Sequence, residues 1–328
     1  VLFRSRPGTE RTDSVGTAWP ARLHVVTGKG GTGKTTVAAA LALALASGGR
    51  RTLLVEVEGR QGIAQLFGTE PLPYEERRIA TTADGGEIRA LAVDAEEALL
   101  EYLDMFYKLG AAGRALRKLG AIDFATTIAP GLRDVLLTGK VKEATTRTAD
   151  GRRVYDAVVL DAPPTGRIGP FLNVTAETAR LARVGPIKTQ SEGVAALLRS
   201  PMTAVHVVTL LEEMPVQETI DAIADLEARQ IPVGRVIVNA ARPPLVTQRV
   251  TLAELRRGLA AAGLPTDRDT VAGLYAEARN EATRRALEDS LRADLRELGR
   301  PLVELPLLPT GVDRAGLDVL AAALANAG

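Results

Sequence analysis

A glycine-rich segment between an apolar stretch and a helical one restricts the fold of this chain more than any other feature. The segment GKGGTGKTT, residues 28–36, follows the strand-like run Arg22–Thr27 and precedes the helical run Val37–Ser47. A strand, a tight loop and a helix in this order begin a right-handed βαβ unit, and such units build parallel sheets. We therefore expect an α/β fold.

The spacing of this segment is that of a phosphate-binding loop, G-x-x-x-x-G-K-[ST]. Its glycines let backbone N–H groups converge on phosphate oxygens, and the start of the helix adds roughly half a positive charge. We expect Lys34 to reach the β- and γ-phosphates of ATP and the Thr35 hydroxyl to bind Mg²⁺. The expected ATP or ADP contacts are Gly28, Lys29, Gly30, Gly31, Thr32, Gly33, Lys34, Thr35 and Thr36.

Short apolar runs with helical segments between them continue along the chain after this loop. Several are apolar almost without interruption, which is typical of strands buried on both faces of a parallel sheet. We predict a doubly wound, mostly parallel sheet of the P-loop NTPase type with helical insertions. The strand-like runs are Arg22–Thr27, Thr52–Val57, Ile88–Val93, Val154–Leu160, Thr203–Leu210 and Val233–Val238.

The length of 328 residues suits either two domains or one large domain. We predict a single domain over residues 21–328, with helical insertions at about 95–150, 168–200 and 245–300. Residues 1–20 carry charges, glycine and proline without an apolar signal-peptide core, so we expect a disordered leader. No run of about 18 apolar residues occurs, and we expect a cytoplasmic protein without an integral membrane segment.

An acidic residue ends one of the apolar runs. Asp161 follows Val154–Leu160 and opens the segment DAPPTGR. A carboxylate at the end of a buried strand is where a Walker B residue holds the Mg²⁺ shell, so we expect Asp161 and Thr35 to be the metal ligands. The two prolines and the glycine after Asp161 suit a switch whose position depends on the γ-phosphate.

Lysine is scarce in this chain, and two lysines fall in the same loop. Only seven of the 41 basic residues are lysines. With Lys29 the loop reads G-K-G-G-x-G-K-[ST]-T, and it resembles the loop of the deviant-Walker class of dimerising ATPases. The resemblance implies that Lys29 reaches the nucleotide of the opposite subunit.

The segment EGRQGIAQLF, residues 58–67, narrows the resemblance to one branch. This branch contains the arsenite-pump ATPase and the ATPase that targets tail-anchored membrane proteins; its first switch reads D-P-A-H-S-L-S-D-x-F, and the first Asp positions the attacking water. Glu58 stands at that position with one methylene more, so we assign catalysis to Glu58, Lys29 and Lys34 and expect slow hydrolysis or a differently spaced switch. Glu56, on the same strand face, is the alternative base, and a helix-capping role is the alternative for Glu58.

Further segments extend the resemblance over about residues 22–325. Residues 130–131 and 212–219 resemble segments of the same branch. Asn239 resembles its adenine-binding asparagine, and Leu305–Pro309 resembles the loop that closes over the base, which makes Pro309 a nucleotide contact. The chain resembles paired actinobacterial members of this branch, and the resemblance implies a homodimer or a heterodimer with a related ATPase chain.

The composition excludes some activities of that family. The chain has no cysteine, so we expect neither an arsenite site nor a zinc thiolate site. Forty-one basic and 40 acidic residues leave no global field for nucleic acid. His24 and His206 fall in strands without a carboxylate cluster, and we expect them to pack rather than to bind metal.

These observations favour a dimeric molecular switch that couples Mg-ATP hydrolysis to a conformational change and to the handling of an unknown protein client, without arsenite transport. A different possibility is an ATPase of the same class that is positioned on a membrane or a chromosome, although residues 317–328 lack the basic residues of a membrane-binding helix. The sequence also leaves open a ligase similar to dethiobiotin synthetase and a scaffold that holds nucleotide with slow turnover.

Overall fold

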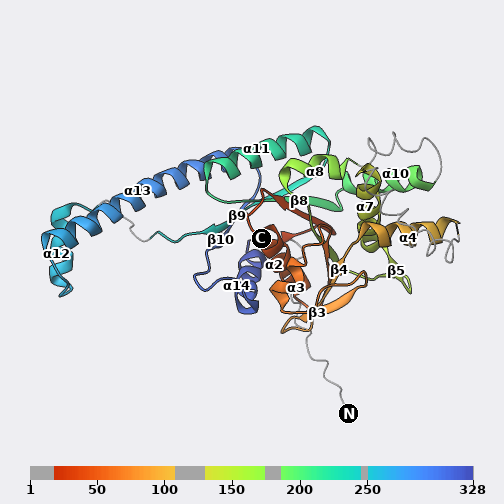
Figure 1. Cartoon of the computed structure of the whole chain (residues 1–328), viewed down its shortest axis with the longest axis horizontal. Helices are drawn as coiled ribbons and strands as arrows, with labels where there is room; N and C mark the ends of the chain where they lie inside the picture. The colour runs from red at the N-terminus through yellow and green to blue at the C-terminus, as the bar shows by residue number, and fades with distance from the viewer. Residues whose placement is uncertain (1–17, 108–129, 174–185, 245–249, 328) are drawn as a thin grey trace, which may run out of the picture.

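The computed structural model describes residues 18–107, 130–173, 186–244 and 250–327. Residues 108–129, within the helical insertion expected at about 95–150, lie outside the described residues. The described chain forms one eight-stranded sheet between two layers of helices, with a small separate hairpin (Figure 1). None of the helices in these ranges is long and apolar enough to cross a membrane.

The sheet is parallel except at one edge, as the sequence predicts. Its strands are β1 (Leu23–Gly28), β2 (Arg51–Glu56), β3 (Arg77–Thr81), β4 (Glu87–Ala92), β7 (Ala157–Asp161), β8 (Thr203–Thr209), β9 (Val233–Ala241) and β10 (Leu302–Pro306); the hairpin pairs β5 (Thr148–Ala149) with β6 (Arg152–Arg153). The order is β10-β9-β8-β1-β7-β2-β4-β3, and only β3 runs antiparallel to its neighbour. In such sheets ligands bind beyond the carboxyl ends of the strands, which is where the glycine-rich loop follows β1.

Helices cover both faces of the sheet. They are α2 (Lys34–Ala46), α3 (Gly62–Phe67), α4 (Ala95–Tyr107), α7 (Pro130–Thr146), α8 (Thr165–Leu172), α10 (Pro186–Leu198), α11 (Glu213–Ala228), α12 (Leu252–Ala261), α13 (Arg268–Glu297) and α14 (Arg314–Ala325). One core contains side chains of α2, α3 and α14, and a second core on the opposite face contains side chains of α4, α7, α8, α10 and α11. Helix α2 is buried almost all round because it lies between the sheet and α14.

Two strands of the eight-stranded sheet were missed by the sequence patterns, as were both strands of the hairpin. Strand β3, with the sequence RRIAT, is an exposed edge strand and lacks the apolar run of a central strand. Strand β10 includes Leu305 and Pro306, which we expected in a loop, so that loop begins only at Leu307. Edge strands carry little hydrophobic signal because one side or both sides face water.

Residues 18–20, which we expected in the disordered leader, belong to the described chain. The Trp19 side chain is only 3% exposed, and its indole Nε1–H donates to the carbonyl oxygen of Leu324 at 3.2 Å. The Arg235 guanidinium lies 4.7 Å from the centre of the Trp19 ring. Trp19 therefore belongs to the folded core, where it fastens the end of α14.

Helices α12 and α13 form an arm that extends away from the sheet (Figure 1). The 30 residues of α13 span about 45 Å at 1.5 Å per residue. Its C-terminal part packs on the body through Leu291 and Leu295, which are buried. Leu287 is 42% exposed although it shares their helical spacing, because α13 leaves the body at this level.

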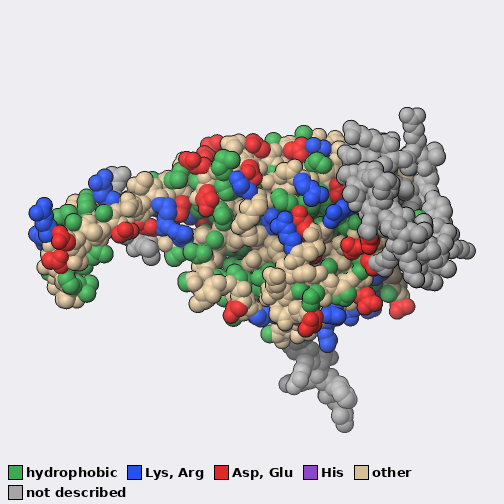
Figure 2. All heavy atoms as spheres, in the orientation of Figure 1, with side chains coloured by type: hydrophobic (Ala, Val, Ile, Leu, Met, Phe, Trp, Pro, Cys, Tyr) green, Lys and Arg blue, Asp and Glu red, His purple; other side chains and the backbone are tan. Residues whose placement is uncertain are grey.

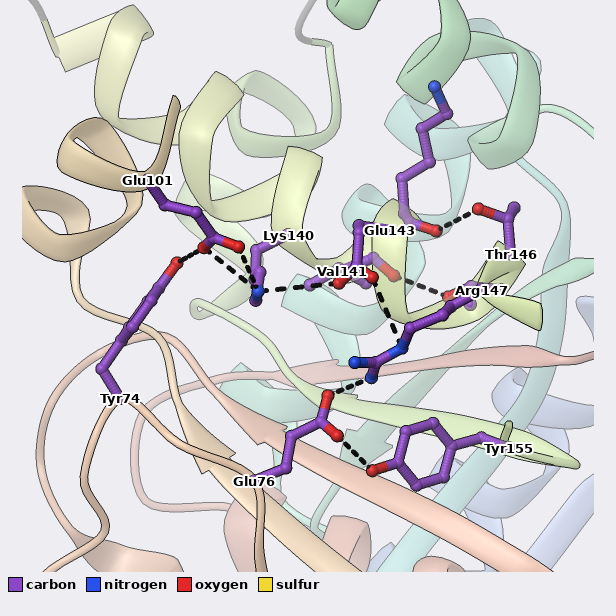
Figure 3. A network of polar contacts seen from close by, with 11 residues as sticks. Tyr74, Glu76, Glu101, Lys140, Val141, Glu143, Thr146, Arg147 and Tyr155 are labelled. Atoms are coloured by element: carbon purple, nitrogen blue, oxygen red, sulfur yellow. Dashed lines mark hydrogen bonds and ion pairs between the residues drawn. The ribbon is translucent and has the colours of Figure 1, made fainter. Parts of the chain in front are cut away.

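A polar network fastens the segment before β3 to the helical layer (Figure 3). Tyr74 donates to Glu101 of α4 at 2.6 Å, and Lys140 of α7 lies 2.8 Å from the same carboxylate. Glu76 contacts Arg147 and accepts a hydrogen bond from Tyr155. Tyr74 and Glu76, in the segment before β3, are therefore held to α4 and to the end of α7 by hydrogen bonds to charged groups.

Candidate functional site

The glycine-rich loop is shaped by two positions that exclude any side chain. A Cβ atom at Gly28 would lie 2.2 Å from the carbonyl oxygen of Val208 on β8. Gly33 has a φ of 86°, and a Cβ atom there would lie 2.3 Å from Nδ2 of Asn239. Two of the predicted loop glycines thus let the loop pack against β8 and β9, and this turns it into the N-terminus of α2.

The middle of the loop is open. A Cβ atom at Gly30 or Gly31 would meet no atom within 4 Å, and both residues are exposed. The first residue of α2, Lys34, is only 8% exposed, while Thr36 in the same turn is half-buried. Backbone N–H groups at a helix N-terminus next to a lysine form a site for phosphate oxygens, so the loop fits the expected nucleotide phosphates.

The Lys34 amine is held at the base of the loop. It donates to the carbonyl oxygen of Lys29 at 3.4 Å, and the Thr32 hydroxyl donates to the same oxygen at 2.9 Å. Burial lowers the pKa of Lys34, whereas the carboxylates of Asp161 and Glu58 oppose this shift. An amine that is partly desolvated and faces two carboxylates is a suitable partner for a phosphate.

Thr35 and Asp161 meet as the sequence predicts. The Thr35 hydroxyl donates to Oδ2 of Asp161 at 2.6 Å. Burial raises the pKa of Asp161 to about 6, although the Thr35 hydrogen bond and the Lys34 charge act in the opposite direction. These two oxygens fit Mg²⁺, which prefers oxygen ligands and completes its shell with water and substrate phosphates. The described residues contain no group of three or more His, Cys, Asp or Glu side chains that could hold a metal alone.

Two glutamates lie beside Asp161. Glu56 pairs with Asp161 across β2 and β7 and is 2% exposed. Its Oε2 accepts from the backbone N–H of Ile63 at 3.3 Å, while its Oε1 has no hydrogen-bond partner in the described structure. Glu58 follows the end of β2, and its carboxylate lies 3.5 Å from Arg60. Both candidate bases therefore lie at the carboxyl edge of the sheet, beside Asp161.

The segment after Glu58 contacts Thr35. A Cβ atom at Gly62 would lie 3.1 Å from Cγ2 of Thr35. Gln61 has a φ of 55°, and its side-chain amide bonds both backbone groups of Leu72, at 2.7 and 3.3 Å. The sequence reasoning did not identify this clamp, because a glutamine that bonds to a loop eleven residues away leaves no local pattern.

Asn239 and Pro309 come from the opposite half of the sheet. Asn239 ends the buried part of β9, and its Nδ2 donates to the carbonyl oxygen of Thr32 at 2.9 Å. Pro309 is exposed in the loop after β10, and Leu307 of that loop donates to the carbonyl oxygen of Ala241 at 2.9 Å. Asn239 is thus hydrogen-bonded to the phosphate-binding loop, and Pro309 lies at the same carboxyl edge of the sheet.

Residues 21–200 match the family model described as anion-transporting ATPase. The chain belongs to the anion-transporting ATPase family. The ATPase BagA of Mycobacterium tuberculosis strain H37Rv is 53% identical over 325 residues, which cover 94% of this chain and 96% of that protein. The ATPase GET3 of Kluyveromyces lactis is 26% identical over 254 residues, or 66% of this chain and 71% of that protein. The family resemblance and the P-loop NTPase fold predicted from the sequence are confirmed.

Lys29 forms an ion pair within the chain that the sequence patterns did not predict. Its Nζ lies 2.7 Å from Oε1 of Glu218, a residue of α11. The Thr165 hydroxyl at the start of α8 donates to Oε2 of the same carboxylate at 3.4 Å. Glu218 thus links the glycine-rich loop to the segment after Asp161. Glu218 lies in the segment 212–219 that resembles the family, but an acidic residue on a half-exposed helix gives no sign of its partner.

Proposed function

We propose that this chain binds Mg-ATP between β1 and α2 and hydrolyses it to ADP and phosphate as a dimeric molecular switch. The observation that supports this most directly is the contact between the Thr35 hydroxyl and Asp161 Oδ2 at 2.6 Å, beside the buried Lys34 amine. A hydroxyl and a carboxylate at this distance provide the protein ligands of a nucleotide-bound Mg²⁺. Membership of an ATPase family agrees with this assignment.

In this proposal each residue has one task. Lys34 and the backbone N–H groups of the loop hold the β- and γ-phosphates, and Thr35 and Asp161 hold the metal. Mg²⁺ supplies positive charge that offsets the charge developing on the phosphate oxygens. Glu58 orients a water molecule for in-line attack on the γ-phosphorus, the bond to the β-phosphate oxygen breaks, and ADP and phosphate are the products.

Asn239 and Pro309 complete the nucleotide site. Asn239 already donates to the loop through Nδ2, which leaves its Oδ1 to accept a hydrogen bond from the adenine amino group. Pro309, in the exposed loop after β10, is proposed to pack over the base. Dimerisation in the presence of ATP would release Lys29 from Glu218 and place it on the nucleotide of the second subunit.

The output of the switch is proposed to be a conformational change that acts on a protein client in the cytoplasm, not arsenite transport. Acidic and basic side chains are interspersed over the face seen in Figure 2, and no broad basic surface for nucleic acid is visible there. The sequence has no cysteine to bind arsenite. The mass of the complex formed with Mg-ATP distinguishes a second copy of this chain from a related chain.

The test measures nucleotide binding, turnover and mass of the purified chain. Lys34→Ala is expected to lose ATP binding, and Asp161→Asn to keep ATP but lose Mg²⁺-dependent turnover. Lys188→Ala is the control, because the amine of this half-exposed lysine pairs, among the described residues, only with Glu192 of its own helix. Wild-type protein with Mg-ATP should sediment as a dimer, alone or with the related chain. Normal ATP binding and turnover by Lys34→Ala would overturn the proposal.

A scaffold that holds ATP with slow turnover is a second candidate function. It is favoured by two features that change the position of the proposed base. The Glu58 side chain is one methylene longer than the aspartate of the family's first switch, and its carboxylate lies 3.5 Å from Arg60. Glu58→Asp separates the two functions. An increase in single-turnover rate of tenfold or more would indicate that the wild-type chain is a slow scaffold, since a misplacement of about 1 Å costs on the order of 100-fold.

A further inference from the structure

A cavity of about 90 Å³ lies beside the proposed nucleotide site. It is bounded by the segment after β2, by the first turns of α7 and by the segment that leads into α8. Three arginines line it, namely Arg60, Arg133 and Arg167, together with the carboxylates of Glu58 and Asp134. We call this cavity the arginine pocket. A water molecule in the liquid takes about 30 Å³, so the cavity has the volume of about three water molecules, which is enough for the five heavy atoms of a phosphate ion.

The arginine pocket has an excess of positive charge. Arg60 lies 3.5 Å from Glu58, and Arg167 lies 4.0 Å from Asp134, so both ion pairs are loose. Within the ranges that the structure describes, the Arg133 guanidinium makes no hydrogen bond or ion pair. Arg133 lies in the first turn of α7 and Arg167 in the first turn of α8, and helix N-termini carry partial positive charge. An anion in the pocket would therefore meet one guanidinium group that has no partner among the described residues and two that are loosely paired.

We propose that the arginine pocket binds inorganic phosphate, the anion that leaves the proposed catalytic site after hydrolysis. This inference rests on the proposed function and adds a second anion site to it. Glu58 belongs to both places, because it lines the pocket and its charge also acts on Lys34. Planar guanidinium groups bind tetrahedral oxyanions through two parallel hydrogen bonds, which gives them an advantage over a single-point cation.

A titration of the ADP-loaded protein with inorganic phosphate tests the pocket, because ADP and Mg²⁺ then occupy the phosphate-binding loop. Calorimetry is expected to show one phosphate site that sulfate competes for and acetate does not. The double variant Arg133→Ala/Arg167→Ala is expected to weaken phosphate binding at least tenfold. Arg256→Ala, an exposed arginine on α12, is the control and should bind phosphate as the wild type does. Both substituted arginines are exposed, and thermal unfolding checks that the variant remains folded.

The same titration of Lys34→Ala keeps the pocket measurable even if nucleotide does not bind. Phosphate binding that survives in Lys34→Ala and disappears on adding Arg133→Ala/Arg167→Ala supports the pocket, whatever the outcome for ATP turnover. Equal phosphate binding by the wild type and the double variant would overturn the inference. Absence of saturable binding to the ADP-loaded wild type, or equal competition by acetate, would overturn it as well.

Discussion

The Nζ atom of Lys29 lies 2.7 Å from Oε1 of Glu218, so α11 of the same chain holds the second lysine of the glycine-rich loop. Both side chains are about one-third exposed, and Glu218 also accepts a hydrogen bond from Thr165 at 3.4 Å. If Lys29 crosses to a second subunit, this ion pair must first break. Glu218 would then compete with the nucleotide of the partner for Lys29.

Glu218→Gln should therefore make ATP-dependent dimerisation easier. The amide can still accept from Thr165 but no longer pairs with the charge of Lys29. Exposed ion pairs contribute about 0.2–1 kcal/mol, so the dimer association constant should rise about 1.4- to 5-fold for each lysine released. Sedimentation with Mg-ATP measures this, and the gain should shrink at high salt because exposed charges are screened.

Glu213→Gln is the control for this comparison, because Glu213 is an exposed acidic residue in the first turn of the same helix. Equal dimerisation of wild type and Glu218→Gln at low salt would show that the Lys29–Glu218 pair does not oppose dimer formation.

Asp161→Asn should stabilise the nucleotide-free protein at alkaline pH. The pKa of Asp161 is raised by burial to about 6 in the folded chain, against 3.8 as the ordinary value. The folded state therefore binds the proton more tightly, and its stability decreases as the pH rises from about 4 through 6. The asparagine carries no charge, so the free energy of unfolding should rise by about 3 kcal/mol at pH 8 and by close to zero near pH 4.

Urea unfolding at these two pH values measures the effect. Asp318→Asn, a substitution of an exposed residue on α14, should change stability by less than about 0.5 kcal/mol. With Mg-ATP present the wild type should instead be more stable than Asp161→Asn, because the metal stabilises only the protein that retains the carboxylate. The same gain for Asp161→Asn at pH 4 and pH 8 would contradict the raised pKa.

Local patterns in the sequence predict the phosphate-binding loop, the place of Asp161 at the end of a strand and most of the parallel sheet. Each depends on a few adjacent residues and on a continuous apolar run, so one segment contains the whole signal. Glu218 and the Gln61 clamp could not be found this way, because their partners are distant in the chain and their residue types are ordinary for exposed surfaces. The edge strand β3 was missed for a related reason, since exposed strands do not need apolar residues.

Asn239→Ala should reduce both affinity for ATP and selectivity against GTP. Its Nδ2 donates to Thr32 at 2.9 Å, and among the described residues its Oδ1 has no hydrogen-bond partner. Oδ1 can accept from the amino group of adenine, whereas guanine presents a carbonyl oxygen at that position. We expect the Kd for ATP to rise about tenfold, which is about 1.4 kcal/mol, and the Kd for GTP to rise less.

Competition binding of both nucleotides provides the measurement, with Asn280→Ala on the exposed side of α13 as the control. A parallel loss of affinity for ATP and GTP would show that Asn239 only positions the loop and does not read the base.

The two histidines should both remain neutral at pH 5.5. Nδ1 of His24 lies 3.0 Å from Nε2 of His206, both rings are buried, and the His206 ring lies 5.0 Å from that of Trp19. Burial lowers the pKa of His24 to about 4, and burial together with His24 and Arg235 lowers the pKa of His206 well below 6.5. The unfolded chain takes up protons below about pH 6.5, so this pair costs stability as the pH falls from 6.5 towards 4.

The backbone also fixes which nitrogen carries the proton. The N–H of Arg235 donates to Nδ1 of His206 at 3.1 Å, so Nε2 of His206 must carry the proton and donate to Nδ1 of His24. Nitrogen-detected NMR of the histidine rings can observe this directly, because the chain has only two histidines. Two neutral rings, each protonated at Nε2, are expected from pH 8 to pH 5.5. An imidazolium signal at pH 5.5, or a proton on Nδ1 of His206, would show that the rings are not packed as the structure has them.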